Sequence, residues 1–424
     1  MRYNLYRQMV VRDENEDIEY WFSTKTGLHI PVKKGQTKEE ATREKLKEIK
    51  EKSQKTDTKK SEKSSAQPKK DTKPLDNSKK SAISNNGGGK IPKQYREAYS
   101  KIMDTVHKSA AANVTENDVI KNAAEIAKAR GKSFGEKEIR QRVAKFKEYQ
   151  DSAKLVDSGA KDKDGNNVFV RFDTQQKYKV GGKFENGEWA GGKYTPERRN
   201  IHNEIISTQE KKDENGKTVK DKDGNIVYEK IDWKSKIPPK GQKPTLVILG
   251  GRGGSGKSRF TDGSLGEDGY DRNKFFVIDP DEYKTRLPEY KDLVDSKSEY
   301  AGLNAWEVHE ESSDMKKAAL NIAMNRGANV VLDGTLAKTK SVLKTIAEFK
   351  KAGYNVEGAY MHLPREVSAA RGVVRGMNGR WVPIENLLAM KNNEDNFTEL
   401  MPEFSKWSMY ENTGKDPVLV AKSD

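Results

Sequence analysis

The C-terminal part of this 424-residue chain is predicted to form a three-layer α/β domain with a mainly parallel sheet. The first observation is a series of short aliphatic and β-branched runs, at 245–249, 274–278 and 327–333, that have the length of buried strands. The second is that segments with the helical spacing of apolar residues lie between and after these runs. Strands that alternate with helices predict βαβ units and a parallel sheet covered by helices.

The composition indicates that the whole chain is not one packed domain. Only 33% of the residues are hydrophobic and 34% are charged, so part of the chain is not expected to enter a core. The formal net charge of +15 comes largely from lysine-rich segments that precede the aliphatic run at 245–249. The charge therefore need not describe the α/β domain itself.

Composition also excludes several kinds of chemistry. The absence of cysteine excludes disulfides, thiolate metal sites and a cysteine nucleophile. The five histidines lie far apart and show no metal-ligand spacing. No apolar run approaches the length of a membrane span, and the segment from Met1 to Arg12 lacks the apolar core of a signal peptide. We therefore expect a cytoplasmic protein without a transition-metal site.

Four segments precede the α/β domain, which we place at 193–424. They are a small β module at 1–35, a Lys- and Ser-rich disordered linker at 36–90, a small helical module at 91–156 and a Gly- and Lys-rich β region at 157–192. The linker has hardly any apolar residues with which to offset the entropy cost of ordering. Its basic charge suits nucleic-acid binding and, equally, a solvated spacer. For the helical module, a spacer or docking role without chemistry is the favoured interpretation.

An internal repeat and a helix start mark the approach to the α/β domain. Residues 161–166 and 220–225 share the pattern Lys-Asp-Lys-Asp-Gly-Asn, and each is followed by a β-prone run, which predicts a hairpin turn. A calcium loop would need its glycine at the sixth position, and the glycine here comes too early. Further on, Thr195 and Pro196 predict the cap and the first residue of a helix.

The run at 245–249 leads directly into G-G-R-G-G-S-G-K-S, which fills the pattern of a phosphate-binding loop. Its glycines allow backbone N–H groups to face a polyphosphate, and the helix expected to follow presents the positive end of its dipole. Lys257 is expected to reach the β- and γ-phosphates, and the Ser258 hydroxyl to hold Mg²⁺. The predicted nucleotide-binding residues are Gly251, Arg252, Gly253, Gly254, Ser255, Gly256, Lys257 and Ser258.

Acidic residues follow the second and third predicted strands, where ligands bind in a parallel sheet. Asp279 lies where the second strand ends and is expected to contact Mg²⁺ or its waters. Asp281 is better placed as the base that accepts a proton from a substrate hydroxyl, although it would serve equally as the cap of the next helix. Asp333 and Thr335 end the third strand, which suits a Walker B role or the binding of a substrate hydroxyl.

Three arginines, Arg371, Arg375 and Arg380, follow the predicted strand at 356–363. In a kinase-like order, such arginines close over the nucleotide as a lid and neutralise charge that develops on the γ-phosphoryl group. A solvated helix surface is the alternative, and it is favoured for Arg371 more than for the other two.

Taken in order, these motifs resemble those of the zeta-toxin family. They are Y-T-P-E-R at 194–198, the phosphate loop, D-P-D-E-Y at 279–283, H-E-E-S-S-D at 309–314, L-D-G-T at 332–335 and the arginines to Arg380. Zeta toxins are P-loop kinases that phosphorylate the 3′-hydroxyl of the sugar in UDP-N-acetylglucosamine and are held inactive by an antitoxin. The resemblance covers about residues 193–424 and implies a P-loop kinase that uses ATP or GTP with Mg²⁺.

The resemblance also implies roles for individual residues. The catalytic group would be Lys257, Asp281, Arg375 and Arg380. Substrate contacts are expected from Asp281, Glu310, Asp333 and Thr335, and contacts to Mg²⁺ from Ser258 and Asp279. The sequence departs from the family at position 333, where Asp stands in place of the expected Glu and shortens the reach by one methylene. Where a further substrate-contacting acid is expected, the aligned residue is Lys317, and the acids nearby are Glu310, Glu311 and Asp314.

The leading expectation is phosphorylation of a nucleotide-sugar hydroxyl, with UDP-N-acetylglucosamine as the acceptor. The alternative enzyme is a polynucleotide or other small-molecule kinase of the same fold, to which the basic linker would bring nucleic acid. The alternative from another class is a structural or delivered protein, for example of a phage particle, that carries the kinase as cargo. In that case residues 1–156 would be dispensable for catalysis and would associate with a larger assembly, or with an antitoxin.

Overall fold

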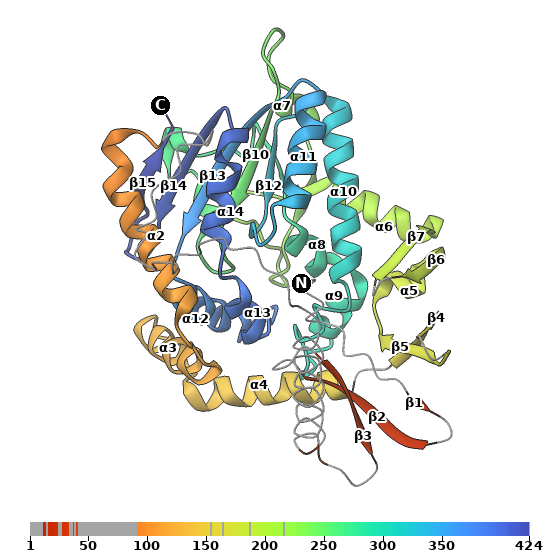
Figure 1. Cartoon of the computed structure of the whole chain (residues 1–424). Coiled ribbons are helices and arrows are strands. Elements are labelled where there is room, and N and C mark those ends of the chain that lie inside the picture. The colour runs from red at the N-terminus through yellow and green to blue at the C-terminus, as the bar shows by residue number, and fades with distance from the viewer. Residues whose placement is uncertain are drawn as a thin grey trace, which may run out of the picture. The chain divides into compact units, whose positions relative to one another are not determined.

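The computed structural model describes residues 12–13, 16–23, 28–33, 37, 40, 91–152, 155–162, 165–185, 188–214 and 217–423 (Figure 1). The chain divides into two compact units. The smaller unit takes its residues from 1–86, 153–172 and 180–193, and the larger unit takes them from 87–152, 173–179 and 194–424. The predicted linker at 36–90 lies outside the described residues, except for positions 37 and 40.

The described part of the smaller unit is built from antiparallel strands. β1 (Arg12–Asp13), β2 (Glu16–Ser23) and β3 (Leu28–Lys33) form one sheet, where the sequence predicts a small β module. β4 (Leu155–Lys161) pairs with β5 (Asn167–Arg171), and β6 (Lys179–Glu185) pairs with β7 (Glu188–Tyr194). Val168, Val170 and Phe184 form a small buried cluster.

Both copies of the repeated Asp-Gly pattern are turns. Gly165 has a φ of +89° between β4 and β5, and the Asn166 N–H donates to Asp162 Oδ1 at 3.0 Å. In the larger unit, the Asn225 N–H donates to Asp221 Oδ1 at 2.8 Å in the equivalent turn. The hairpin turns predicted at these two places are confirmed.

Six strands form the central sheet of the larger unit, in the order β11-β12-β10-β13-β14-β15. Along the chain they are β10 (Thr245–Gly250), β11 (Phe276–Ile278), β12 (Val330–Asp333), β13 (Asn355–His362), β14 (Lys406–Glu411) and β15 (Val418–Lys422). All neighbouring strands are parallel except β14 and β15, which are antiparallel. The predicted α/β fold with a mainly parallel sheet is confirmed.

The sequence analysis missed strand β14. Its apolar residues are interrupted by lysine, serine and glutamate, so they do not form a continuous run. In the structure Trp407, Met409 and Tyr410 are buried between β13 and β15.

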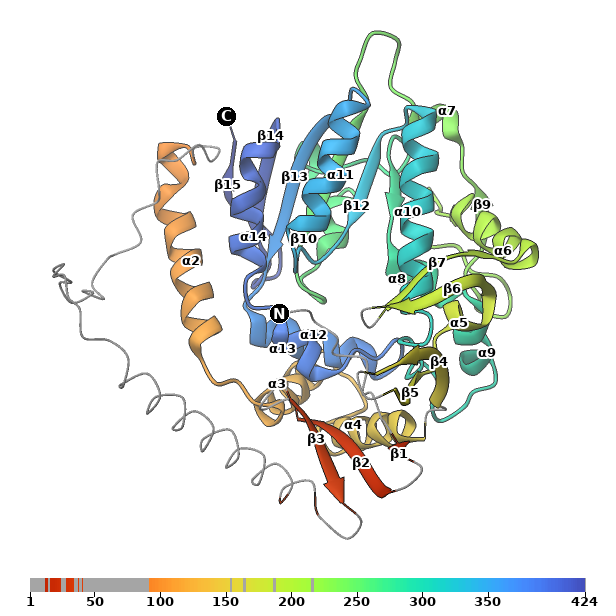
Figure 2. The same cartoon turned by 45° about the vertical axis from the view of Figure 1, so that its right-hand side comes forward.

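Hydrophobic clusters on the two faces of the sheet hold it between its covering layers. Leu246 and Ile248 of β10 enter one cluster, and Val247 and Leu249 enter the other, as the alternation of a strand requires. The first face is covered by α10 (His309–Arg326), α11 (Lys340–Lys351) and α14 (Asn393–Leu400) (Figures 1 and 2).

The opposite face is covered by the segment that follows the phosphate loop. Phe260 is fully buried there, and Leu265, Tyr270 and Phe275 pack around the same cluster. This segment contains the short 3₁₀ turns η2 (Lys257–Phe260) and η3 (Gly266–Asp268). The prediction of an α-helix directly after the phosphate loop is therefore wrong, because the 3₁₀ turn η2 stands at that place.

The helical module packs into the larger unit. It consists of α2 (Arg96–Ala111), α3 (Glu116–Ala129) and α4 (Glu136–Asp151). Tyr99, Ile102 and Val106 of α2 share one hydrophobic core with β10, and α3 packs against α12 (Arg365–Gly376) and α13 (Ile384–Ala389) (Figure 2). The larger unit thus includes the helical module predicted at 91–156, whereas the α/β domain was expected to start at 193. The reason is that the apolar side of α2 completes the core of the α/β domain.

The remaining elements of the larger unit are short. They are η1 (Lys93–Tyr95), α5 (Thr174–Tyr178), α6 (Pro196–Ile206), β8 (Thr208–Glu210), β9 (Tyr228–Lys230), α7 (Trp233–Lys236), α8 (Pro280–Arg286), α9 (Pro288–Asp295) and η4 (Met401–Glu403). At the start of α6 the hydroxyl of Thr195, the predicted cap, accepts from the Arg198 N–H at 3.3 Å. Among the described residues, no helix combines the length and apolarity that crossing a membrane requires.

Candidate active site

The phosphate loop connects β10 to η2 through a tightly turned backbone. Gly256 has a φ of +89°, in the left-handed region that favours glycine. A Cβ atom at Gly251 would lie 2.7 Å from the Met361 carbonyl oxygen, so this position also requires glycine. Beyond β14, Asn412 donates from Nδ2 to the Ser255 carbonyl at 2.8 Å. Contacts from neighbouring strands therefore hold the loop in shape.

Lys257 links the phosphate loop to the end of β12. Its Nζ donates to the Gly251 carbonyl at 3.0 Å and lies 3.5 Å from Asp333 Oδ1. Burial raises the pKa of Asp333 to about 7 despite the Lys257 ammonium, and the charges of Asp279 and Asp281 add to the rise. The structure thus brings the predicted phosphate-binding lysine and the predicted substrate-binding acid together.

The side chain of Arg252 points away from the nucleotide side of the loop. Its guanidinium is buried and pairs with Glu394 of α14, with 2.7 Å between Nη2 and Oε2. It also donates to the Met390 carbonyl at 2.8 Å, while His362 Nδ1 lies 2.8 Å from the same Glu394 carboxylate. The sequence-based assignment of Arg252 to nucleotide binding is therefore restricted to its backbone N–H.

Asp279 and Asp281 both follow β11 but make different contacts. Asp279 caps α8, because its Oδ1 accepts from the Asp281 N–H at 2.8 Å. Asp281 lies in the first turn of α8, and its side chain pairs with Lys284 at 2.9 Å and with Arg380. Burial favours the neutral acid, but the two cations outweigh it and hold the pKa of Asp281 well below its usual range. Asp281 is thus an ionised carboxylate held by two cations.

Lys284 and His309 belong to the surroundings of Asp281, and the sequence analysis did not assign them to the site. Lys284 is 6% exposed, and burial lowers its pKa although Asp281 opposes the change. The charge of Lys284, together with burial, lowers the pKa of His309 to about 3, so the imidazole is neutral at physiological pH. Asp281 and Lys284 are three residues apart on a predicted helix, and this spacing could have indicated from the sequence that the two side chains pair.

A cavity of about 530 Å³ lies beside the phosphate loop and gathers many of the predicted residues. Those that line it are Gly254, Gly256, Lys257, Ser258, Asp279, Asp333, Arg371 and Arg375. Arg371 is held by a hydrogen bond from Nη1 to the Asn412 carbonyl at 2.9 Å. Desolvation and the charge of neighbouring Arg380 lower the pKa of Arg375. The three predicted lid arginines therefore have two different locations. Arg371 and Arg375 line the cavity at the phosphate loop, and Arg380 pairs with Asp281.

The oxygen donors in this cavity suit Mg²⁺. The Ser258 hydroxyl is exposed, and the carboxylates of Asp279 and Asp333 line the same space. In the part of the chain that the structure describes, no group of three or more acidic or histidine side chains forms a complete metal site. Mg²⁺ commonly takes one or two protein oxygens and completes its shell with phosphates and water, so the residues present fit this ion.

The acidic motif at 309–314 is used mainly for structure. Glu311 is fully buried, and Arg198 Nη2 donates to its Oε2 at 2.8 Å. Asp314 accepts from Lys179 Nζ at 2.8 Å. Glu311 and Asp314 were two of the acids that could have replaced the missing substrate contact at Lys317. In the structure they instead hold Arg198 of α6 and Lys179 against α10. Glu310 is half-buried in the first turn of α10 and remains a predicted substrate contact.

α14 holds the loop that contains Thr335. Asn393 Nδ2 donates to the Thr335 carbonyl at 2.5 Å, and Asn396 Nδ2 donates to the Leu336 carbonyl at 2.7 Å. Leu336 has a φ of +56°, which is uncommon for a side chain of its size. Since Glu394 of the same helix holds the phosphate loop, α14 links both loops. This role could not be predicted from the sequence, because polar residues on a predicted helix give no local signal of their distant partners.

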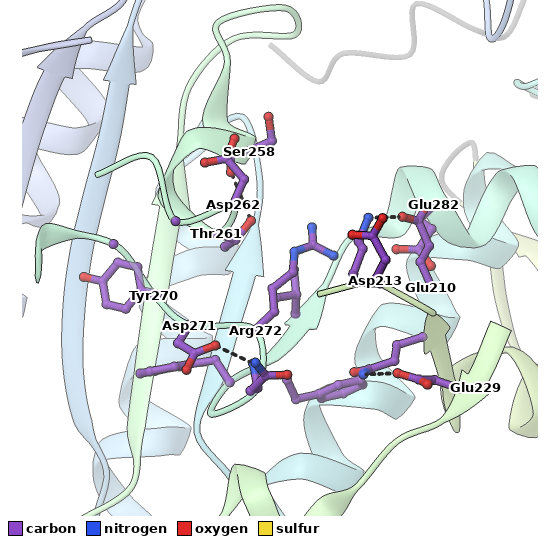
Figure 3. A pocket seen from close by; sticks show the side chains of 18 of the residues that line it. Glu210, Asp213, Glu229, Ser258, Thr261, Asp262, Tyr270, Asp271, Arg272 and Glu282 are labelled. Carbon is purple, nitrogen blue, oxygen red and sulfur yellow. Dashed lines mark hydrogen bonds and ion pairs between the residues drawn. The ribbon is translucent and has the colours of Figure 1, made fainter. Parts of the chain in front are cut away.

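A second cavity, of about 550 Å³, lies beyond Ser258 on the side of β8 and β9. Figure 3 shows Glu210, Asp213 and Glu282 on one side of this cavity, Ser258 on the other and Arg272 between them. Burial and the charges of Glu210 and Asp279 raise the pKa of Glu282 to about 7. The space next to the phosphate loop is thus acidic on this side, which disfavours a polyphosphate there.

A mostly parallel sheet with a phosphate loop after an inner strand, and acids at the ends of the adjacent strands, defines a P-loop α/β domain. Residues 228–415 match the family model for zeta toxin. The resemblance to zeta toxins noted in the sequence is therefore confirmed for residues 228–415, and we refer to this range as the zeta-toxin-like domain.

Two curated relatives support the same assignment. A 124-residue stretch is 27% identical to Toxin zeta of Enterococcus hirae and covers 29% of this chain and 41% of that protein. The values for Toxin zeta of Streptococcus pyogenes are the same. The chain therefore spans about two-fifths of the length of the curated relatives that it matches.

Two solved structures with some similarity come from a toxin–antitoxin system and from a complex crystallised with ATP. One is from the PezAT chromosomal toxin–antitoxin system of Streptococcus pneumoniae, with 22% identity, a TM-score of 0.33 and coverage of 43% of this chain and 72% of that chain. Another is AvrRxo1-ORF1:-ORF2 with ATP, with 18% identity, a TM-score of 0.39 and coverage of 59% and 76%.

Proposed function

We propose that the zeta-toxin-like domain transfers the γ-phosphate of ATP or GTP to a hydroxyl of a nucleotide sugar, namely the 3′-hydroxyl of UDP-N-acetylglucosamine. The observation that carries the proposal is the cavity at the phosphate loop, which brings Lys257, Asp333 and Arg375 together. Asp281, two residues after the cavity-lining Asp279, pairs with Arg380. A base, an arginine and a phosphate-binding loop are the parts that phosphoryl transfer needs. The acceptor class rests on the family resemblance.

In the proposed reaction, the acceptor oxygen forms a bond to the γ-phosphorus while the bond from that phosphorus to the bridging oxygen breaks. ADP or GDP leaves, and the hydroxyl proton passes to the Asp281 carboxylate. Because Arg380 and Lys284 depress the pKa of Asp281, the carboxylate first orients the hydroxyl and takes the proton late. Movement of Arg380 to the transferring phosphate would release Asp281 and raise its basicity when the proton leaves.

Two further groups would support this step. Lys257 would move from the Gly251 carbonyl to the phosphates, and Arg375, which lines the cavity, would bind the γ-phosphoryl oxygens. Mg²⁺ held by Ser258 and Asp279 would neutralise charge on the β- and γ-phosphates. Asp333 and Thr335 are proposed to bind the sugar, and an antitoxin is proposed as a protein partner.

The test is transfer of labelled γ-phosphate from ATP, with Mg²⁺, to UDP-N-acetylglucosamine, followed by location of the phosphate on the product. Wild type is expected to form the 3′-phosphate, and Lys257→Ala to form none. Lys274→Ala, at an exposed position, is the control for loss of a lysine. Turnover of ATP with nucleic-acid ends or another small molecule as the only acceptor would reject the nucleotide sugar. Absence of transfer to every acceptor would reject the kinase.

A further inference from the structure

The helical module reaches the nucleotide cavity. The turn at the end of α3, Arg130-Gly131-Lys132, places Arg130 and Lys132 in the lining of the 530 Å³ cavity that contains Lys257 and Ser258. Both residues precede the range 228–415 that matches the zeta toxin family. The phosphate loop is thus faced by side chains from a part of the chain for which the sequence predicts no chemistry.

The backbone of this turn is fixed by a helix-ending motif. The Lys132 N–H donates to the Ala127 carbonyl at 2.9 Å, and the Gly131 N–H donates to the Lys128 carbonyl at 3.0 Å. Gly131 has a φ of +62°, as the glycine that follows a helix in a Schellman motif does. Arg130 and Lys132 are therefore presented by an ordered turn.

The position of α3 is fixed by packing. Its residues Val119, Ile120, Ala123 and Ala127 are at most 1% exposed, and the helix packs on α12, which carries Arg371 and Arg375. The turn and the arginines of α12 consequently form one surface of the cavity.

That surface has an excess of positive charge. The cavity is lined by five cationic side chains, Arg130, Lys132, Lys257, Arg371 and Arg375, and by two acids, Asp279 and Asp333. The charge of Arg130 contributes, after burial, to a lowered pKa of Arg371, as expected when like charges face each other. Among the described residues, neither Arg130 nor Lys132 has a carboxylate within ion-pair distance, whereas Lys145 and Lys147 of α4 do.

We propose that Arg130 and Lys132 bind the polyphosphate of the nucleoside triphosphate, so that the helical module is part of the nucleotide site. A nucleotide in this cavity would bring its negative charge to these two cations and relieve the repulsion between Arg130 and Arg371. This deepens the proposed function, since it rests on a nucleoside triphosphate occupying the phosphate loop. It does not depend on the identity of the acceptor.

The test is equilibrium binding of ATP with Mg²⁺ to the full chain, with the variants Arg130→Ala, Lys132→Ala and the double variant. Each single change is expected to weaken ATP binding by about two- to fivefold, as for loss of one solvated charge contact, and the double change more. Lys128→Ala, at an exposed position in the last turn of α3 that does not line the cavity, is the matched control and should bind ATP as wild type does.

Adenosine binding separates phosphate recognition from general damage. The variants should lose affinity for ATP but keep their affinity for adenosine, and the loss should shrink at high salt. Equal loss for ATP and adenosine, or no loss for ATP, would overturn the proposal while leaving the kinase intact. If wild type and variants bind no ATP at all, both this proposal and the proposed function fail. ATP binding that weakens in the variants without transfer to UDP-N-acetylglucosamine would support this proposal and reject only the acceptor.

Discussion

The pKa of the Asp333 carboxyl group is higher in the folded chain than in the unfolded chain. Its pKa rises from about 3.8 to about 7, first because of burial and then because of the charges of Asp279 and Asp281. A group with a raised pKa binds more protons in the folded state, so its contribution to stability is fully present below about pH 4 and is lost as the pH rises through about 7. Ionisation of Asp333 near neutral pH therefore lowers the stability of the folded chain.

Replacement of this acid should flatten the pH dependence of stability. Asp333→Asn is expected to raise the melting temperature at pH 8 more than at pH 5, because asparagine removes the cost of burying a charge. Thermal unfolding at several pH values between 5 and 8 measures the effect. Asp292→Asn, at an exposed position on α9, is the control. Parallel pH profiles for wild type and Asp333→Asn would contradict the raised pKa.

Asp281 should affect chemistry much more than nucleotide binding. Asp281→Asn keeps the size of the side chain but removes the charge that is proposed to orient and deprotonate the acceptor, so the turnover rate should fall by about a hundredfold or more. The dissociation constant of ATP should stay within about twofold of that of wild type, because Asp281 is proposed to act on the acceptor and does not line the cavity at the phosphate loop. Single-turnover kinetics and ATP titration make the comparison. A loss confined to ATP affinity would show that Asp281 acts on the nucleotide instead.

At the scale of elements, α14 sets the shape of two loops through side chains that do not line the cavity at the phosphate loop. Its Glu394 is fully buried, and its ion pair with Arg252 fastens the phosphate loop. Burial raises the pKa of Glu394, but His362 and Arg252 lower it to about 2, so the carboxylate is charged. Removal of one partner from such a pair leaves the other charge buried without compensation.

Glu394→Gln is expected to lower the free energy of unfolding by about 3–5 kcal/mol. Glu399→Gln, at an exposed position of the same helix, should change it by less than about 0.5 kcal/mol. Denaturant unfolding of the two variants gives the comparison. Equal stability would mean that the phosphate loop does not depend on α14.

The helical module should unfold together with the α/β domain. Ile120 of α3 is 1% exposed, and Ile120→Ala should cost about 2–5 kcal/mol by leaving a cavity. Lys121→Ala at the exposed neighbouring position is the control. Because α2 completes the core around β10, we expect the whole larger unit to melt in one transition at a lower temperature. A separate early transition with an unchanged main one would support the independent module predicted from the sequence.

The strands and loops that carry the chemistry were predictable because their signals are local. An aliphatic run before a glycine-rich loop predicts β10 and the phosphate loop. The position of Asp279 and Asp333 at the ends of two predicted strands indicates that they belong to the site. The direction of the Arg252 side chain was not predictable, because its partner Glu394 lies more than a hundred positions further along the chain. The same reason explains why Lys132 and the α14 residues were missed, since only the tertiary fold brings them to the site.

At the scale of the whole molecule, the larger unit combines segments from both halves of the sequence around one cavity. The phosphate loop and the acids after β11 and β12 come from the zeta-toxin-like range, and Arg130 with Lys132 comes from the preceding module. This arrangement disagrees with the expectation that residues 1–156 can be removed without loss of catalysis, because that deletion removes α2 from the core.

The proposed reaction couples cleavage of a nucleoside triphosphate to phosphorylation of a nucleotide sugar, so both products should form together. The most direct measurement is the amount of ADP and of phosphorylated UDP-N-acetylglucosamine formed by the full chain with ATP and Mg²⁺. We expect the two products in equal amounts from wild type and neither product from Lys257→Ala. Formation of ADP without the phosphorylated sugar, or of neither product, would contradict it.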